Sequence, residues 1–434
     1  MQALFRLLKE NPGYARLWSA QVVSLTGDWF NTIVLSALVV DYSDGSGLAV
    51  SLFLLARFLP PLLIGPVAGV LVDRFDRKRI LVASNFARVF IVLGFLLASE
   101  PDRLWIIYAL TIAQFSISAF FEPGQSAITP SLVRRRDLIQ ANTLASITWS
   151  VMLAMGAIAG GIVSALFGAP VALIIDAVTF AVAGWLISTI DDSKVVEEAV
   201  ADATSTGAMP PVPAVPTDEG RSFRDGLRYL RQHPGTVAVM LVKGGGSIGN
   251  TDTLLTIYGT QIFVIGNEGQ LSLGILYSAF GLGAMFGPLL LNRINDGSVR
   301  RMRRLLTIGF FWAAFGWVVM GVAGSIVVAS LALLIRAMGG SANWTYSSVI
   351  IQKTVPDNYL GRVFSLDLAA FQLATVVSTI VHGALLDTLG TDYIEAIVFG
   401  TAFVSALPLF MWLWALVRME RREEARELAA STTS

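Results

Sequence analysis

The stretch Gly69–Arg79, GVLVDRFDRKR, joins two long apolar runs and is the most informative segment of the chain. Asp73 and Arg74 follow the glycine by about one helical turn, and Arg77 to Arg79 add three positive charges. Lysine and arginine gather on the cytoplasmic side of membrane proteins. The stretch therefore predicts a short cytoplasmic loop that follows a membrane-spanning helix.

The composition is that of a membrane protein. Of the 434 residues, 54% are hydrophobic and 14% are charged, and the mean hydropathy is +0.66. A soluble protein of this length needs a more polar surface. There is no cysteine, which excludes disulfide and thiolate chemistry. The zero net charge says nothing about partners, because the charge is segregated by side of the membrane. We expect no nucleic-acid partner.

Apolar runs long enough to cross a bilayer, which takes about 20 residues, occur in two blocks of six. The first block covers 16–41, 47–72, 79–99, 104–130, 139–167 and 170–190, and the second covers 236–265, 270–292, 304–323, 326–351, 363–387 and 393–417. A membrane barrel would show alternating segments of about 10 residues instead. We predict an all-α membrane protein with twelve transmembrane helices in two six-helix bundles.

Residues 191–222 separate the two blocks and are rich in acidic residues, Ser, Thr, Ala and Pro. This composition predicts a solvated cytoplasmic linker. The predicted N-terminal bundle then covers 1–190, the C-terminal bundle covers 223–420, and 421–434 form a cytoplasmic tail. The segment 223–233, FRDGLRYLRQH, has apolar residues at helical spacing between arginines. It either lies along the membrane surface or leads as a helix into the seventh span.

The basic residues also predict the orientation in the membrane. With the N-terminus inside, 26 of the 31 lysines and arginines fall in cytoplasmic segments, and only Arg103 falls in an outside loop. Both termini are therefore predicted to be cytoplasmic, in a multi-pass protein of the inner (plasma) membrane. Residues 1–15 do not resemble a cleavable signal peptide.

The spacing within Gly69–Arg79 resembles the signature loop between the second and third helices of the major facilitator superfamily of transporters. In that family the loop latches the two halves in the outward-facing state, against the start of the eleventh helix. Asp76 stands where many members have glycine. The resemblance assigns the latch to Gly69, Asp73, Arg74, Arg77 and Arg362.

Longer stretches are similar to the macrolide-efflux and enterobactin-exporter branch of the family. These stretches are NPGYARLWSAQVVSLTGDWF (11–30), ARFLPPLLIGPVAGVLVDRFDRKR (56–79), FFEPGQSAITPSLV (120–133), LIQAN (138–142) and VPDNYLGRVFS (355–365). Members of the branch are mainly proton-linked exporters of drugs or siderophores. The resemblance thus implies a small-molecule substrate, protons as the coupling ion, alternating access, and no enzymatic activity.

Ionisable residues inside the predicted spans are costly unless paired or hydrated, so they indicate function. Asp28 and Arg57 are predicted at similar depth and could form an ion pair near mid-membrane; Arg88 and Glu122 could form a second one. A desolvated carboxyl group holds its proton more tightly. Asp28 is therefore favoured over Glu122 as the proton-coupling residue, with helix-to-helix bracing as the open alternative.

The second half offers Lys243, Asp252, Arg336, Asp367 and His382. Lys243 and Asp252 are predicted to lie too far apart to pair directly, Asp367 to be a helix cap or latch group, and His382 to be a satisfied polar contact. A run of glycines, Gly244 to Gly246, predicts a broken seventh span. An aromatic wall for a bulky apolar ligand could be drawn from Trp29, Phe30, Phe121, Trp149, Tyr258, Trp344 and Phe371.

Other classes of function find less support in the sequence. Two scattered histidines and no cysteine argue against a membrane enzyme, and no GxxxxGK[ST] loop for an ATP-driven pump occurs. No metal or cofactor is expected, and we expect a monomer. An importer or a lipid flippase of the same fold, or a non-transporting receptor, stays open, as do the substrate and the direction of transport.

The predicted topology is testable with reporter fusions. A reporter fused at Gly45 or Gly266 should report the outside, and one fused at Arg134 or Ser205 should report the cytoplasm, because the basic residues segregate by side. A reversed signal at Ser205, within the linker, or at Gly266, after it, would contradict the arrangement in two blocks.

Overall fold

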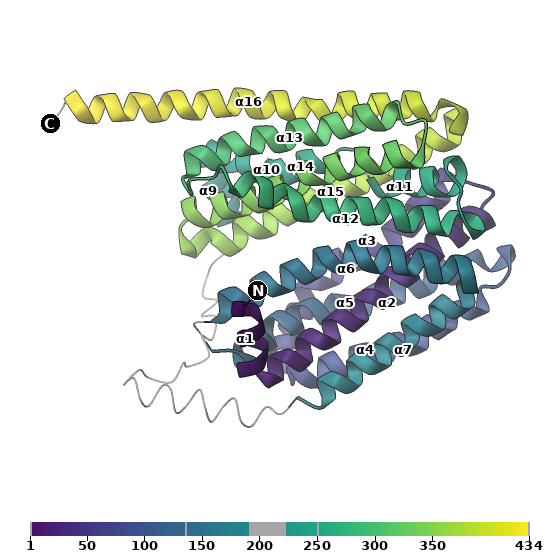
Figure 1. Ribbon diagram of the computed structural model, residues 1–434. Coiled ribbons are helices and arrows are strands. Elements are labelled where there is room, and N and C mark those ends of the chain that lie inside the picture. Colours follow the sequence, from purple (N-terminus) through teal and green to yellow (C-terminus); the bar gives the residue numbers. More distant parts are fainter. Residues whose placement is uncertain (1, 135–136, 191–222, 250, 433–434) are drawn as a thin grey trace, which may run out of the picture. The chain divides into compact units, whose positions relative to one another are not determined.

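The computed structural model describes the chain from Gln2 to Thr432, apart from residues 135–136, 191–222 and 250. Every regular element within the described residues is helical (Figure 1). This is expected in lipid, where the backbone finds no external hydrogen-bond partners and has to satisfy its own. The predicted linker 191–222 lies outside the described residues.

The described residues from Gln2 to Ile190 form seven α-helices. They are α1 (Gln2–Glu10), α2 (Pro12–Tyr42), α3 (Gly47–Arg74), α4 (Arg77–Gly94), α5 (Leu104–Leu132), α6 (Leu138–Phe167) and α7 (Ala169–Ser188), with 3₁₀ turns η1 (Phe95–Leu97) and η2 (Pro101–Arg103). Proline begins α2, where its missing N–H costs nothing. Gly168, with φ +81°, makes the tight connection between α6 and α7.

The second half begins with α9 and is helical to the end of the described chain. Its elements are α9 (Phe223–Gln232), α10 (Pro234–Ser247), α11 (Thr251–Ile257), η4 (Tyr258–Ile262), η5 (Asn267–Gly269), α12 (Gln270–Asn292), α13 (Val299–Gly321), α14 (Ile326–Thr354), α15 (Asp357–Leu389), η6 (Thr391–Tyr393) and α16 (Ile394–Thr432). Ser298 and Ser325 cap α13 and α14 by accepting a main-chain N–H. The predicted tail 421–434 continues the helix of α16 as far as Thr432.

Eleven helical segments of the described chain are long and apolar enough to cross a membrane. The remaining predicted span, 236–265, is the seventh along the chain and is broken into α10, α11 and the π-helix η4. The break follows the predicted glycine run, and Gly249 there has φ +94°. The fold class predicted from the sequence, an all-α membrane protein, is confirmed.

The chain divides into two compact units. Unit 1 contains Met1–Gly45, Leu52–Gly220 and Gly259–Gly274, and unit 2 contains Ser46–Ser51, Arg221–Tyr258 and Ile275–Ser434. In unit 1, α2 packs against α6 and α7, and α4 packs against α5 and α7. In unit 2, α13 packs against α14 and α16, and α10 packs against α14 and α15. The predicted domain limits at 190 and 223 stay a prediction.

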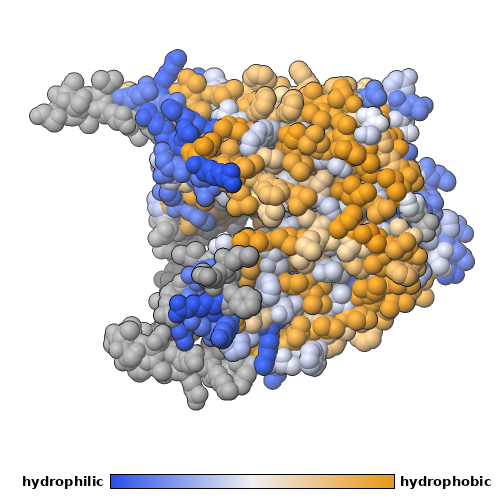
Figure 2. Space-filling view, viewed as in Figure 1, coloured by the Kyte–Doolittle hydropathy of each residue, from blue (hydrophilic) through white to orange (hydrophobic). Residues whose placement is uncertain are grey.

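The helices expose large apolar side chains to the outside of each bundle. Phe90 is 74% exposed, Val327 is 73% exposed and Phe403 is 70% exposed. The face seen in Figure 2 is apolar over the middle of the helices, and hydrophilic residues gather at the helix ends. Such a surface is stable in lipid, whereas in water it would be a large exposed apolar patch.

Helices α13 and α14 approach closely because glycines face each other. A Cβ atom at Gly339 would lie 2.2 Å from the main-chain oxygen of Gly309, and one at Gly309 would lie 2.1 Å from the Asn343 side-chain amide. Small residues at such positions allow membrane helices to pack backbone against backbone. The next residue, Gly340, has open space where a Cβ would be.

This pair of adjacent glycines provides a matched test of the packing. We expect Gly339→Ala to lower the stability of the purified protein by about 1–3 kcal/mol, the usual cost of overpacking. Gly340→Ala should leave stability unchanged or slightly raised, since alanine favours helix. Thermal unfolding in detergent measures both, and equal effects would show that the close approach of α13 and α14 is not rigid.

Candidate functional site

Three buried or half-buried charged residues meet inside unit 1. Asp28 lies midway along α2, Arg88 lies on α4 and Asp176 lies on α7. Arg88 and Asp176 are 3% and 0% exposed, and Asp28 is partly exposed. Each of the two carboxyl groups interacts electrostatically with Arg88, and they interact with each other. Together they are a candidate site for charge or proton transfer within the membrane.

Arg88 is held between aromatic rings. Its guanidinium carbon lies 4.7 Å from the ring centre of Phe121 and 4.4 Å from that of Phe180. It also donates to the main-chain oxygen of Ser84 and to the side-chain oxygen of Asn85, both at 3.3 Å. The cation–π contacts and hydrogen bonds partly compensate the loss of water around this buried cation.

The sequence analysis did not select Asp176 as a candidate residue, although it is the single acidic residue in an otherwise largely apolar helix. Its carboxyl group lies against α2, where a Cβ at Gly27 would be 2.4 Å from Oδ1. Glycine at position 27 is therefore required for this approach. The signal that could have identified Asp176 is its charge within a predicted span, the same signal that identified Asp28.

Arg57 on α3 contacts α2 at Thr32, one helical turn after Asp28. Its guanidinium donates to the Thr32 hydroxyl at 3.0 Å, and that hydroxyl donates to the main-chain oxygen of Asp28 at 2.7 Å. The rings of Phe53 and Phe115 lie 5.9 and 5.1 Å from the guanidinium carbon. The Asp28–Arg57 ion pair stays a prediction.

The predicted pair of Arg88 with Glu122 cannot be followed, because the Glu122 side chain lies outside the described residues. Among the described side chains, Arg88 has Asp28 and Asp176 as electrostatic partners.

The loop between α3 and α4 is built around Asp76. Its carboxyl group caps α4 by accepting the main-chain N–H of Arg79 at 3.1 Å, and it also lies 3.4 Å from the Arg79 guanidinium. Arg77 donates to the main-chain oxygen of Ala127 on α5 at 2.9 Å, and Lys78 donates to that of Ile190. Asp76, the residue that departs from the usual glycine, thus supplies a helix cap.

The other predicted latch residues lie at helix ends. Gly69, Asp73 and Arg74 are in the last turns of α3, and Arg74 is exposed. The Asp73 side chain lies outside the described residues. Arg362 lies in the second turn of α15, with its guanidinium 5.5 Å from the Tyr359 ring centre. The latch role of these residues stays a prediction.

Unit 2 contains a buried ion pair that sequence reasoning did not predict. Lys243 on α10 donates to the carboxyl group of Asp367 on α15, and their side chains are 4% and 1% exposed. The ammonium nitrogen lies 4.6 Å from the ring centre of Trp344 and 5.5 Å from that of Phe364. The sequence predicted Asp367 to be a helix cap or latch group and did not identify Lys243 as its partner.

Arg336 supports the broken helix between α10 and α11. It donates at 2.8 Å to the main-chain oxygen of Gly249, whose N–H donates to the Ser378 hydroxyl at 3.0 Å. The Ser405 hydroxyl donates to the main-chain oxygen of Ile248 at 2.9 Å. Side chains thereby replace the hydrogen bonds that the break removes, as a membrane interior requires.

His382 is a well-satisfied polar residue in the same unit. One ring nitrogen lies 2.7 Å from the main-chain oxygen of Ser378, and the other lies 2.8 Å from the Thr401 hydroxyl. With both nitrogens engaged, the residue links α15 to α16.

Two of the aromatic candidates pack together beside the Lys243–Asp367 pair. The rings of Trp344 and Phe371 meet edge to face with centres 5.0 Å apart, and Trp344 is 43% exposed. This geometry is favourable for aromatic pairs, and the indole remains partly exposed. Trp29 and Phe30 instead pack against the glycines of α6, where a Cβ at Gly160 would lie 3.0 Å from the Phe30 Cα atom.

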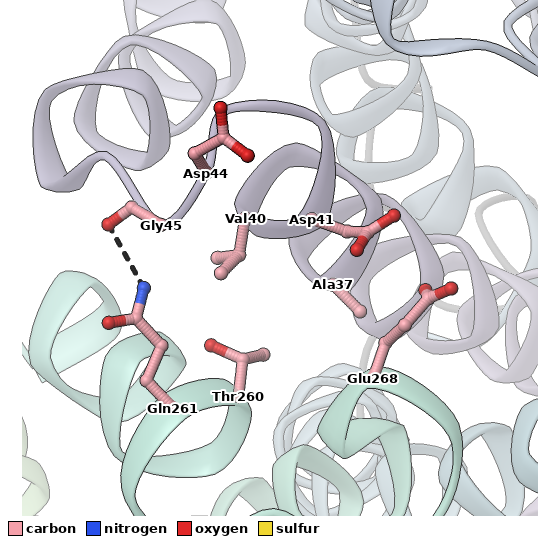
Figure 3. Close-up of a pocket in the computed structure, with 8 residues that line it drawn as sticks. All are labelled: Ala37, Val40, Asp41, Asp44, Gly45, Thr260, Gln261 and Glu268. Atoms are coloured by element: carbon pink, nitrogen blue, oxygen red, sulfur yellow. Dashed lines mark hydrogen bonds between the residues drawn. The ribbon is translucent and has the colours of Figure 1, made fainter.

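A pocket of about 320 Å³ lies in unit 1 beside the end of α2 (Figure 3). Three carboxyl groups line it, those of Asp41, Asp44 and Glu268, and Gln261 donates to the main-chain oxygen of Gly45 at 2.9 Å. Burial raises the pKa of Glu268, and the nearby charge of Asp41 adds to the effect. Folding therefore favours the protonated carboxyl group more than the unfolded chain does, so the stability of the folded chain falls as the pH rises through this pKa.

The family model of the major facilitator superfamily matches residues 17–366 and 271–433. The chain belongs to the major facilitator superfamily. It is a multi-pass membrane transporter and not an enzyme, and its family, foreseen from Gly69–Arg79, is confirmed.

Relatives of this facilitator include transporters named for export. The macrolide efflux protein A of Streptococcus pyogenes is 24% identical over 399 residues, covering 87% of this chain and 90% of its own. The putative bacilysin exporter BacE of Bacillus subtilis is 24% identical, covering 86% and 88%. An uncharacterized MFS-type transporter of the same species, YfiS, is 25% identical and covers 89% of each chain.

Solved facilitator structures share the fold at low sequence identity. The nucleoside transporter NupG is 11% identical with a TM-score of 0.67, covering 93% of this chain and 98% of its own. A bacterial homologue of the iron transporter ferroportin is 14% identical with a TM-score of 0.64, covering 92% and 98%. At these identities the likeness concerns the fold alone.

The buried pair in unit 2 gives a double-mutant test. Lys243→Met or Asp367→Asn alone leaves one buried charge unpaired, and each should cost about 3–5 kcal/mol of stability. The double variant removes both charges, so its loss should be well below the sum of the single losses. Thermal unfolding of the four proteins in detergent measures the coupling, and strictly additive losses would contradict the ion pair.

Proposed function

We propose that this facilitator is a proton-coupled exporter of a drug-like or siderophore-like small molecule that works by alternating access. Macrolide efflux protein A and the putative bacilysin exporter, which resemble it along most of their length, support the direction of transport. In facilitators the substrate path lies between two six-helix halves. Protons moving down their gradient would drive the substrate out.

The observation that carries the proposal is the carboxyl group of Asp28 inside unit 1. It lies midway along a membrane-spanning helix, is partly exposed, and interacts with the buried Arg88. A carboxyl group placed there can bind a proton when the cavity opens to one side and lose it when the cavity opens to the other. The arginine supplies a counter-charge that keeps the ionised form attainable.

A bulky, partly apolar substrate is supported by the aromatic pair in unit 2. Trp344 and Phe371 form an apolar wall next to the Lys243 ammonium group. Ligand sites of this kind combine aromatic walls with few polar groups. The Trp344–Phe371 pair is our candidate for substrate contact.

The cytoplasmic latch is part of the same proposal. Asp73 at the end of α3, with Arg74 and Arg77, would stabilise one state of the cycle by pairing near the start of α15 at Arg362. Both termini would lie in the cytoplasm, and a monomer would suffice for transport.

The proposed function is tested in everted membrane vesicles with an acidified lumen. A panel of macrolides, peptide antibiotics and siderophores is added one at a time, and a pH-sensitive dye follows the lumen. For a proton-coupled exporter, a transported compound accumulates in the lumen and releases protons from it. Accumulation without proton release would contradict proton coupling. If no compound accumulates, an importer, a flippase or a receptor is favoured.

We expect Asp28→Asn to abolish proton-driven accumulation while leaving passive counterflow of the same compound, because the cavity survives but the proton site does not. Asp41→Asn is the matched control, since it makes the same change at an exposed position of the same helix. If Asp28→Asn still concentrates the compound against its gradient, the coupling residue lies elsewhere and Asp28 is structural.

We expect Asp73→Asn to slow transport while equilibrium binding of the compound changes by no more than a few fold. The charge would stabilise one conformation only, and only such differential contacts shift a conformational equilibrium. Asp76→Asn is the control in the same loop, because asparagine also caps helices. Wild-type turnover in the Asp73→Asn protein would remove the latch assignment.

A further inference from the structure

The start of α3 is capped by a residue from a distant helix. Asp387, in the last turn of α15, accepts the main-chain N–H of Gly47 at 2.6 Å through Oδ1 and that of Leu48 at 3.3 Å through Oδ2. The same Oδ2 accepts the Ser46 hydroxyl at 3.0 Å. The first N–H groups of a helix have no partner within it, and a negative charge is favourable at this end. Asp387 therefore satisfies two N–H groups that α3 cannot satisfy by itself.

Ser46 connects this cap to the first turn of α3. Its hydroxyl donates to Asp387 and accepts the main-chain N–H of Ala49 at 3.1 Å. The next N–H, that of Val50, donates to the main-chain oxygen of Ser46 at 3.2 Å. The N–H groups from Gly47 to Val50 are thus all engaged, and the cap is complete only while Asp387 is in place.

Glycines bring the two helix ends into direct contact. A Cβ at Gly47 would lie 2.6 Å from the Leu386 Cβ, and one at Gly383 would lie 2.8 Å from the main-chain oxygen of Gly47. One turn further along α3, the buried Ser51 hydroxyl donates to the main-chain oxygen of Thr379 at 2.7 Å. Small residues allow membrane helices to meet backbone against backbone in this way.

The same contacts divide α3 between the two units. Ser46–Ser51 belong with α15 to unit 2, whereas α3 from Leu52 on belongs to unit 1, although the helix is continuous. Asp387 is exposed, so water can replace its hydrogen bonds when the contact opens. A buried pair such as Lys243–Asp367 could open only at a much higher cost. The cap by Asp387 therefore suits a contact that opens and closes.

The sequence before Asp387 repeats the spacing of the signature stretch. The segment GALLD (383–387) has a glycine four residues before an aspartate, as has GVLVD (69–73). Both segments lie in the last two turns of their helices, α15 and α3. The first lies against the start of α3, and the family resemblance places the second near the start of α15. Each of the two helices thus carries the same pattern at its own end.

We propose that Asp387 and Gly383 form a clasp on Ser46–Ser51, at the end of α3 opposite the Asp73 latch, and that this clasp holds α3 against α15 in the state closed at that end. The opening of the clasp during transport rests on the proposed alternating access, in which the two halves move relative to each other. The holding of the contact by Asp387 does not depend on that proposal. The latch at Asp73 stabilises the opposite state, so the two ends compete.

A single introduced thiol can report the opening, because the chain contains no cysteine. Ser51 is 0% exposed behind the clasp, and Ser51→Cys places a thiol there that a water-soluble maleimide reaches only when α3 leaves α15. Labelling is followed in the purified protein in detergent. In the Ser51→Cys protein we expect Asp387→Asn to raise the labelling rate about fivefold, the population change that follows from the typical loss of a helix cap. The amide has no charge, and its NH₂ group cannot accept from the donors of α3.

Two controls separate opening from a general loosening of the fold. Asp392→Asn makes the same change at an exposed position in the next turn, η6, and should leave the rate unchanged. Ala329→Cys places the thiol at a 0% exposed position near the start of α14, in the same unit but outside the clasp, and its labelling should stay slow in the Asp387→Asn protein.

The alternatives give different labelling patterns. Equal acceleration of both thiols would show that Asp387 stabilises the fold and is not a clasp, and an unchanged rate at both would show that the cap does not hold the contact closed. Should Asp387→Asn fail to fold, Ser46→Ala replaces it, because it removes the hydroxyl that Asp387 binds. Faster labelling at position 51 alone is again expected, and an unchanged rate rejects the clasp.

The latch should act with the opposite sign. Asp73→Asn weakens the state that is open at the clasp, so it should lower the labelling rate of the Ser51→Cys protein. A raised or unchanged rate would overturn the competition between the two ends.

The labelling needs no transported compound, so its result is separate from that of the vesicle experiment. Faster labelling in the Asp387→Asn protein without export of any compound would uphold the clasp and reject the proposed exporter. Proton-driven export together with unchanged labelling would do the opposite.

Discussion

A bilayer supplies neither hydrogen bonds nor counter-ions to the residues inside it. Every regular element of the described residues is therefore a helix, in which the backbone forms its own hydrogen bonds. Where the helix breaks between α10 and α11, Arg336, Ser378 and Ser405 take over the hydrogen bonds of Ile248 and Gly249. Arg336 is thereby explained as a structural residue, although a buried arginine on a membrane helix first indicates function.

The same constraint governs the buried charges. Lys243 and Asp367 neutralise each other across α10 and α15, and aromatic rings cover the ammonium group. In unit 1, Arg88 is enclosed by Phe121 and Phe180 and faces two acids. The first cluster pairs one base with one acid, whereas Arg88 has two acidic partners among the described side chains. Asp28 is also partly exposed, whereas Lys243 and Asp367 are both buried, so unit 1 is the better candidate for coupling to protons.

Glycines allow the close helix contacts around the charged residues of unit 1. Gly27 lets the Asp176 side chain reach the backbone of α2, and Gly184 lets Asn85 bring α4 against α7. A side chain at either place would push the helices apart and separate the charges. The positions of the carboxyl groups therefore depend on residues that carry no chemistry of their own.

Much of the fold could be predicted because it depends on local composition. The length of an apolar run sets a span, so the predicted run 47–72 became α3 and the run 270–292 became α12 almost residue for residue. The glycine run after Lys243 predicted the break in the seventh span. The loop Gly69–Arg79 indicated the family by its spacing, and Asp28 and Arg88 were recognised as candidates because a charge in an apolar run is visible without a structure.

The partners of those charges were decided only by tertiary packing. Lys243 and Asp367 are separated by 124 residues, and Asp176 reaches Asp28 from a helix far along the chain. The position of a residue along its predicted span indicates its depth in the membrane but not the direction in which its side chain points. The sequence therefore suggested pairs at equal depth, such as Asp28 with Arg57. The rotation of each helix about its axis is fixed by close contacts such as Gly27 with Asp176, and those contacts exist only once the helices have packed.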